Sequence, residues 1–216
     1  MAIEDTPRHQ GLRRRLVEGL KIKGIESEQV LEAIGKVPRH AFMESSFINF
    51  AYRDQAFPIG AGQTISQPFT VAFQTQLLKL FPLCKVLEVG TGSGYQAAVL
   101  CELKAKVYTI ERHQSLYIKA GKLLPQLGYQ PNFFLGDGYK GLPTYGPFDR
   151  ILVTAGADHV PEELLSQLVV GGMLVIPVGT GDQQEMLRII RRSETLYDTE
   201  THGAFVFVPL LRGTVN

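Results

Sequence analysis

The sequence predicts an α/β fold: a doubly wound, mostly parallel sheet with helices on both faces, an N-terminal helical extension and a C-terminal antiparallel hairpin. Three observations support this class. Residues 8–47 carry the apolar spacing of helices, and from about residue 84 short apolar runs alternate with helix-like segments. The last two apolar runs, within residues 185–211, have no helix between them. Alternating strands and helices are typical of right-handed crossovers, which build a parallel sheet with covered faces.

The composition is that of a globular protein with one sizeable core. The chain has 216 residues, 44% of them hydrophobic and 20% charged, and a net charge of +1. Because no Gly-, Pro- or Ser-rich linker divides it, we expect a single domain over residues 1–216. Residues 1–57 are predicted as the helical extension and residues 58–216 as the binding core. The near-neutral charge argues against nucleic-acid and membrane partners.

The chain shows no sign of export, membrane insertion or metal binding. The first ten residues have no apolar core, and no apolar run approaches the ~20 residues that span a bilayer. Cys84 and Cys101 lie in apolar surroundings and outside any metal-spaced motif, which indicates a reducing compartment and no metal site. We therefore expect a cytoplasmic protein. A monomer is also expected, although the sequence leaves the oligomeric state open.

The N-terminal extension is predicted as two helices. The first covers residues 7–24, and the second begins after Ser27, a candidate N-cap, and stops at Pro38. Three arginines at positions 13–15 fall on the first helix. We interpret them as a solvated helix face, because three charges make a weak binding patch.

A polar, glycine-bearing loop is predicted over residues 58–68, followed by a helix over 69–81. Ser66 stands in front of this helix, and Pro68 lies near its first position. Two interpretations of Ser66 stay open. Its side chain caps the helix, or its hydroxyl meets a substrate at the helix N-terminus, where an anion is favoured.

The remaining elements alternate along the chain. Strands are predicted at residues 85–90, 106–111, 132–137, 149–156 and 173–179. Helices are predicted between them at residues 95–103, 113–124 and 161–168. The two last strand-like runs are expected to form an antiparallel hairpin at the edge of the sheet.

A glycine loop follows the first of these strands. Gly90, Gly92 and Gly94 alternate there, and Glu111 ends the next strand. Glycine lets a ligand approach the backbone closely, and the helix that follows directs free N–H groups at it. A carboxylate at the second strand end can accept hydrogen bonds from both hydroxyls of a ribose. The pattern predicts a site for a nucleoside-containing cofactor.

The loop spacing favours S-adenosylmethionine over NAD. A dinucleotide fingerprint reads G-x-G-x-x-G, whereas this loop reads G-x-G-x-G and follows the acidic Glu88. The cationic amino and sulfonium groups of S-adenosylmethionine tolerate a nearby carboxylate that a pyrophosphate would not. At the third strand end, Asp137 is placed to accept from an adenine amino group, and Gly138 leaves room for the ring. A tight turn without a ligand stays as the alternative.

Five blocks of the sequence resemble the successive motifs of protein-L-isoaspartate O-methyltransferases. The resemblance runs in the same order from about residue 25 to residue 210, and the polar block "GQTISQP" is its most selective part. The blocks are residues 59–68, 86–100, 136–157, 164–179 and 205–210. The resemblance implies the Rossmann-like methyltransferase fold.

The family resemblance also implies an activity and its residues. A methyl group passes from S-adenosylmethionine to the α-carboxylate of an L-isoaspartyl residue in a damaged peptide or protein, leaving S-adenosyl-L-homocysteine. The ester then closes to a succinimide, whose hydrolysis restores some normal aspartyl linkage. Ser66 is the expected catalytic residue. The expected cofactor-binding residues are Thr64, Ile65, Glu88, Gly90, Thr91, Gly92, Ser93, Gly94, Glu111, Asp137 and Gly138.

This chemistry needs alignment more than acid–base catalysis. A free carboxylate has a pKa near ~4 and is a nucleophile at neutral pH, so no catalytic histidine is expected. Three rival functions are a methyltransferase of RNA or a small metabolite, a non-catalytic binding module, and an NAD-dependent oxidoreductase. The near-neutral charge opposes RNA, the intact loop and acidic residues oppose a binding module, and the glycine spacing opposes NAD.

Overall fold

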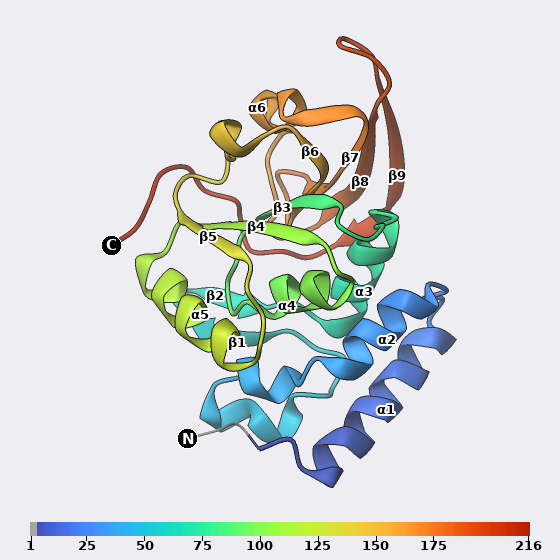
Figure 1. Cartoon of the computed structure of the whole chain (residues 1–216), viewed down its shortest axis with the longest axis vertical. Coiled ribbons are helices and arrows are strands. Elements are labelled where there is room, and N and C mark those ends of the chain that lie inside the picture. The colour runs from blue at the N-terminus through green and yellow to red at the C-terminus, as the bar shows by residue number, and fades with distance from the viewer. Residues whose placement is uncertain (1–3) are drawn as a thin grey trace.

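The computed structural model describes residues 4–216, and a seven-stranded sheet forms its centre (Figure 1). The strand order is β5-β4-β3-β6-β7-β8-β9. Strands β3 to β7 run parallel, and β8 and β9 are added antiparallel at one edge. The predicted fold class and the C-terminal hairpin are confirmed. The strands are β3 (Lys85–Val89), β4 (Lys106–Glu111), β5 (Asn132–Leu135), β6 (Phe148–Val153), β7 (Leu168–Val178), β8 (Gln184–Arg191) and β9 (Tyr197–Phe205).

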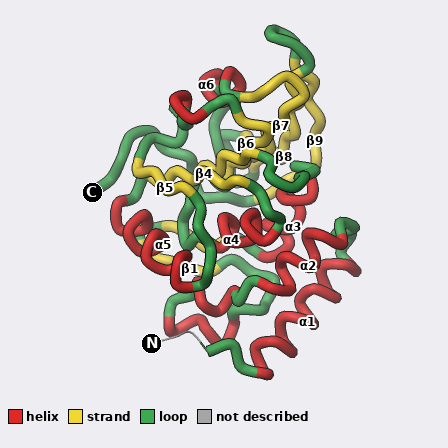
Figure 2. The backbone as a smooth tube through the Cα atoms, in the orientation of Figure 1, coloured by secondary structure: helices red, strands yellow, loops and turns green. Residues whose placement is uncertain are grey.

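The helices cover the two faces of the sheet unequally (Figure 2). Helices α1 to α5 lie on one face, and the short helix α6 lies on the other. No helix within residues 4–216 combines the length and the apolar character that crossing a bilayer requires. The helices are α1 (Pro7–Ile22), α2 (Glu28–Lys36), α3 (Pro68–Leu77), α4 (Tyr95–Glu102), α5 (Gln114–Gln126) and α6 (Glu162–Ser166), with 3-10 turns η1 (Arg39–Phe42), η2 (Ser45–Phe50) and η3 (Pro143–Tyr145).

The order of the strands reverses between β3 and β6. The chain adds β4 and β5 outward on one side of β3 and then returns to pair β6 with its other side. The glycine loop leaves β3 at this point. In an open α/β sheet, ligands bind beyond the carboxyl ends of the strands where the order reverses.

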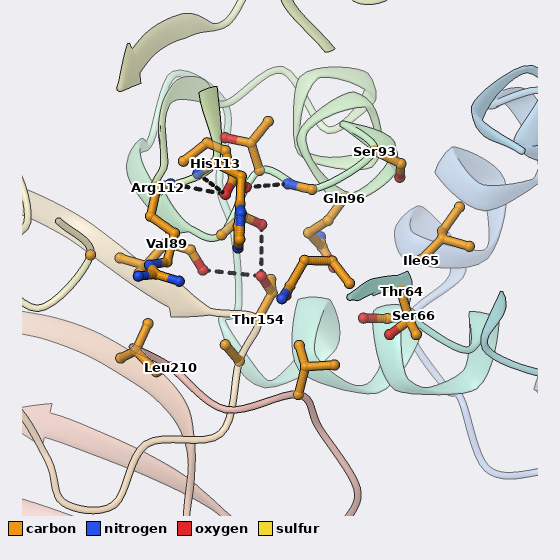
Figure 3. A pocket seen from close by; sticks show the side chains of 18 of the residues that line it. Thr64, Ile65, Ser66, Val89, Ser93, Gln96, Arg112, His113, Thr154 and Leu210 are labelled. Carbon is orange, nitrogen blue, oxygen red and sulfur yellow. Dashed lines mark hydrogen bonds between the residues drawn. The ribbon is translucent and has the colours of Figure 1, made fainter. Parts of the chain in front are cut away.

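Residues 58–68, predicted as a loop, contain a small antiparallel ribbon. Strands β1 (Phe57–Gly60) and β2 (Gln63–Ile65) pair with each other and stay separate from the main sheet. The turn between them has positive φ at Gly60, Ala61 and Gly62, which favours glycine. The ribbon brings Thr64 and Ile65 over the carboxyl edge of the sheet, as Figure 3 shows.

The interpretation of Ser66 as a helix cap is wrong. Helix α3 begins at Pro68, Gln67 occupies the cap position, and no side chain of that residue bonds the helix end. Instead, the backbone N–H of Phe69 donates to Asp54 Oδ1 at 2.8 Å. A carboxylate from the N-terminal extension therefore caps α3, and the Ser66 hydroxyl is not used for it.

One of the three N-terminal arginines is buried, contrary to the prediction of a solvated face. Arg13 is 7% exposed, forms an ion pair with Asp5 and donates to the Gly35 carbonyl at 2.7 Å. Arg14 and Arg15 are exposed, as predicted. One side of helix α1 packs on α2 and carries the buried Arg13. The other side is exposed to solvent and carries Arg14 and Arg15.

The extension shares the hydrophobic core of the sheet. Leu20 of α1 and Ile34 of α2 belong to the same buried cluster as Val86 of β3 and Leu100 of α4. The opposite face of the sheet has its own cluster, centred on β6 and β7 and covered by α6. Burial of several large apolar side chains fixes the extension against α3 and α4, which border the site.

Candidate active site

A cavity of about 770 Å³, open to solvent, lies where the strand order reverses. Its wall comes from the ends of β3, β4 and β6, from the β1–β2 ribbon and from the C-terminal segment (Figure 3). Most residues predicted to hold a cofactor or a substrate line this one cavity. They are Thr64, Ile65, Ser66, Gly90, Thr91, Gly92, Ser93, Glu111 and Gly138.

The glycine loop is held close to two neighbouring strands. Backbone N–H groups of Gly90 and Thr91 donate to the Ile110 carbonyl at 2.9 and 3.3 Å. Gly90 has a φ of 98°, and a Cβ built on it would lie 2.5 Å from Thr154 Oγ1. The Thr154 hydroxyl itself donates to the Gly90 carbonyl at 2.7 Å. Only glycine permits this contact between the ends of β3 and β6.

Glu111 is placed at the cavity wall by backbone donors. Its Oε2 accepts from Gly92 N at 2.8 Å, and its Oε1 accepts from Arg112 N and His113 N, each at 2.9 Å. A carboxylate has about four acceptor sites, so about one remains, on Oε2. The carboxylate is oriented in advance and can still accept a hydrogen bond from a ligand hydroxyl.

Glu88 does not line the cavity, unlike its predicted role at the cofactor. Its side chain is fully buried inside β3, where Oε2 accepts from Thr109 Oγ1 at 2.6 Å and Oε1 has no partner. Burial raises the pKa of Glu88 to about 8, and the Thr109 hydrogen bond opposes the shift. A residue inside a strand of a doubly covered sheet points into a packed layer, so only residues at the strand end reach the cavity.

Gly94 also lies behind the cavity wall. It has a φ of 88°, and a Cβ there would be 2.7 Å from Leu124 Cδ1 of α5. Its role is therefore to let α4 begin against α5. Gly138, which does line the cavity, has a similar constraint, because a Cβ would be 2.5 Å from Val89 Cγ1.

Asp137 lies outside the cavity lining and holds the backbone. Its Oδ1 accepts from Tyr139 N at 3.0 Å, and its Oδ2 accepts from Gly213 N at 2.9 Å. The carboxylate therefore ties the C-terminal segment to the end of β5. Its predicted contact with an adenine amino group stays a prediction.

The C-terminal segment, to which the sequence assigned no role, closes one side of the cavity. Leu210 and Leu211 line it, and Val215 pairs with His113 beside the start of α5. Arg112 Nε also donates a hydrogen bond to the Gly213 carbonyl at 3.2 Å, which helps to hold the C-terminal segment in place. These contacts join residues about a hundred positions apart, which no local pattern reveals.

A second cavity of about 1030 Å³ adjoins the first. Thr64, Ser66, Thr154 and Val208 line both cavities, so they form the boundary between them. The rest of the second cavity is mostly apolar and comes from α3 and the end of β9. Its other residues are Ala56, Gln67, Phe69, Thr70 and Ala204 to Phe207. Thr154 was not predicted as a site residue, although its place at the end of β6 was a signal.

The lining of the first cavity fits a nucleoside-containing cofactor. Glu111 keeps an acceptor for a hydroxyl, and the side chains of Val89, Ile110 and Leu210 offer apolar walls for a flat ring. The second cavity meets the first at a hydroxyl, Ser66, and at the beginning of α3. A molecule in each cavity would face the other across residue 66.

Comparison with known proteins identifies the family of this chain. The family model described as protein-L-isoaspartate(D-aspartate) O-methyltransferase matches residues 11–214. The chain belongs to this family. The isoaspartate methyltransferase of Christiangramia forsetii is 61% identical over 97% of this chain and 98% of its own length. The one from Dictyoglomus thermophilum is 48% identical over 95% and 94%.

Solved structures of isoaspartate methyltransferases share the fold. One, with 29% identity and a TM-score of 0.83, covers 91% of this chain and 65% of its own. Another, from Plasmodium falciparum, has 26% identity and a TM-score of 0.80 and covers 92% and 98%. The Plasmodium protein is in complex with S-adenosyl-L-homocysteine.

Proposed function

We propose that the cavity at the strand reversal binds S-adenosylmethionine and that the adjoining cavity presents the α-carboxylate of an L-isoaspartyl residue to it. Membership of the isoaspartate methyltransferase family supports the activity, and the family name states the substrate. The observation that carries the assignment of the two cavities is their meeting at Ser66. The near-neutral charge and this family membership favour a protein substrate over the alternative of RNA or a small metabolite.

The cofactor is proposed to lie along the carboxyl ends of β3, β4 and β5. Glu111 accepts from the ribose, and Gly138 and the apolar side chains of Ile110 and Leu210 border the adenine. Thr64 and Ile65, on the ribbon, close the cavity from the opposite side (Figure 3). The glycine loop and Ser93 border the remaining part. When bound, S-adenosylmethionine supplies an electrophilic methyl group on a sulfonium sulfur.

Glu88, Gly94 and Asp137 are proposed to support the cofactor from behind the wall. Asp137 does so through the tie to Gly213, and Gly94 through the packing of α4 on α5. Glu88 reaches the cavity only through hydroxyl groups, as described in the next subsection. In this proposal the three residues act on the cofactor indirectly, whereas the sequence predicted that they bind it.

The peptide is proposed to lie in the second cavity, with its carboxylate at the Ser66 hydroxyl. The apolar lining suits a flexible chain of varied sequence, because it asks for no particular charged partner. Val206, at the cavity mouth, is 75% exposed, and the outer edge of β9 carries backbone groups that an extended peptide can pair with. Such a site recognises backbone more than side chains.

The enzyme's residues would align and desolvate the acceptor. A single donor at Ser66 orders the carboxylate oxygen and leaves it nucleophilic, whereas an arginine would hold its charge more strongly. Alignment of this kind can lower a barrier by up to ~7–11 kcal/mol. The histidine of the cofactor cavity, His113, lies across the view from Ser66 in Figure 3 and has no role in this step.

Other properties stay predictions from the sequence. These are the single-domain organisation, the monomeric state, the cytoplasmic location and the absence of nucleic-acid, membrane and metal partners. The shared core of the extension and the sheet supports the single-domain prediction.

The proposal is tested with two peptides of the same sequence, one containing L-isoaspartate and one normal aspartate. Radiolabelled methyl from S-adenosylmethionine should pass to the first and not to the second. Calorimetry with S-adenosyl-L-homocysteine should show one binding site per chain. Equal labelling of both peptides would contradict the assigned substrate, and an absence of binding would contradict the assigned cavity.

A further inference from the structure

A chain of hydroxyl groups joins the buried Glu88 to the proposed cofactor cavity. Glu88 Oε2 and Thr109 Oγ1 lie 2.6 Å apart, and Thr109 Oγ1 and Thr91 Oγ1 also lie 2.6 Å apart. Thr109 is fully buried, whereas Thr91 is a lining residue of the cavity. The carboxyl group is therefore out of contact with the cofactor position and linked to it through two hydroxyls.

Among residues 4–216, the groups that act on the charge of Glu88 include no cation. Facing it are Glu111 from β4 and the thiol of Cys101 from α4, and the thiol is neutral because burial raises its pKa to about 12. On the other side, β6 pairs the apolar Leu152 with it. Among residues 4–216 no lysine, arginine or histidine forms an ion pair with Glu88. Burial without a balancing cation favours the protonated form of Glu88.

The hydrogen bonds can run in either direction, because a hydroxyl both donates and accepts. With Glu88 neutral, its O–H donates to Thr109, Thr109 donates to Thr91, and the Thr91 hydrogen is free. With Glu88 ionised, Thr109 donates to the carboxylate and Thr91 donates to Thr109. In the first arrangement, the Thr91 hydroxyl directs its hydrogen away from the Thr109 hydroxyl. In the second arrangement, it directs a lone pair there instead.

We propose that Glu88 distinguishes S-adenosylmethionine from S-adenosyl-L-homocysteine by giving up a proton when the sulfonium compound binds. The two compounds differ by one methyl group and one positive charge. A cation in the cavity stabilises the ionised carboxylate, so the O–H bond of Glu88 breaks and the proton passes to the buffer. The neutral product stabilises it less, so the proton returns as methyl transfer removes the charge. The inference depends on the proposed cofactor cavity.

The sign of the pH effect follows from linkage. A bound cation lowers the pKa of Glu88 from its free value of about 8, so S-adenosylmethionine binds more tightly as the pH rises toward 8. The affinity for S-adenosyl-L-homocysteine does not show this rise with pH. A pKa lowered by about one unit makes the ratio of the two affinities rise about tenfold between pH 6 and pH 9, and a half-unit change makes it rise about threefold.

Calorimetry of the full chain tests the proposal directly. Titration with each compound at pH 7.5, in buffers of different ionisation enthalpy, gives the number of protons released. We expect S-adenosylmethionine to release about half a proton more than S-adenosyl-L-homocysteine, for a shift of about one unit. The isosteric variant Glu88→Gln should remove this difference and leave a pH-independent affinity ratio, equal to that of the wild type at low pH. Comparing variant with wild type subtracts His113, which also lines the cavity.

A second readout does not involve the cofactor. A native pKa of about 8, above the ordinary 4.5, makes the wild-type free energy of unfolding fall as the pH rises from about 4.5 to 8. The free energy of unfolding of Glu88→Gln should not show this part of the decrease with pH. If the variant does not fold, Thr109→Val serves instead, because loss of its hydrogen bond raises the Glu88 pKa further and moves the rise in affinity ratio to higher pH.

The outcomes separate this inference from the proposed function. Tight binding of both compounds with equal proton release in the wild type overturns the role of Glu88 and leaves the cofactor site intact. A proton difference that persists in Glu88→Gln also overturns it. If neither compound binds, both the cofactor site and this inference are wrong.

Discussion

The two cavities that meet at Ser66 have differently built walls. The proposed cofactor cavity has oriented polar groups on one side: Glu111 is held by three backbone N–H groups, and Gly90 is locked against Thr154. The residues of the second cavity that the first does not share are mostly apolar and include the end of an edge strand, with Val206 exposed. A site for one constant molecule can orient its polar groups in advance, whereas a site for varied peptides gains from few specific contacts.

The glycine loop of the first cavity, which contacts the shared wall at Thr154, is the first place to break this difference. In Gly90→Ala, the alanine would have a φ of 98° and a Cβ 2.5 Å from Thr154 Oγ1. We therefore expect the free energy of unfolding to fall by about 2–4 kcal/mol and cofactor binding to be lost. Urea unfolding measures the first, and calorimetry the second. Gly121→Ala, in α5 with open space around its Cβ, is the control and should gain about 0.5–1 kcal/mol. Wild-type stability in Gly90→Ala would show that the loop adapts.

Removal of the oriented carboxylate should affect one cavity only. We expect Glu111→Ala to weaken S-adenosyl-L-homocysteine binding by about 100-fold, because it removes charge-assisted hydrogen bonds and frees the loop amides. Isothermal calorimetry gives the affinity. The exposed Glu194→Ala, in the turn between β8 and β9, should bind like the wild type. An unchanged affinity in Glu111→Ala would mean that the cofactor lies elsewhere.

Ser66 tests the boundary itself. Ser66→Ala should lower kcat by about 10- to 100-fold and change the affinity for S-adenosyl-L-homocysteine by less than about twofold, because one hydrogen-bond donor to the reacting oxygen is lost. Steady-state kinetics with an isoaspartyl peptide separates kcat from KM. The exposed Ser115→Ala in α5 is the matched control. Full turnover in Ser66→Ala would leave the residue without a catalytic role.

The smallest effect is expected in the second cavity. Val206→Ala should raise KM for an isoaspartyl peptide about three- to fivefold, since about one apolar contact at the mouth is lost. Cofactor affinity and kcat should not change. Leu196→Ala, 57% exposed near the start of β9, controls for surface hydrophobicity. If both variants behave alike, the peptide does not use this mouth.

The sequence was most informative where local pattern and position decide the structure. Strand–helix alternation gave the parallel sheet, and the ends of successive strands placed Gly90, Glu111 and Gly138 at one edge. It did not reveal that Glu88 is buried and lies outside the cavity lining, since the side-chain direction within a strand depends on which faces are covered. It also failed for the tie between Asp137 and Gly213, 76 positions apart, because nothing local encodes such a pairing.

The cap on α3 connects the helical extension to the boundary between the two cavities. Asp54 holds the first turn of the helix behind Ser66 and is itself ion-paired to Lys23 at 2.6 Å, although it lines neither of the two cavities. A saturation mutagenesis screen for lost repair activity should therefore score position 54 alongside positions 66 and 111. Residues chosen for such a library by distance from the ligands alone would omit it.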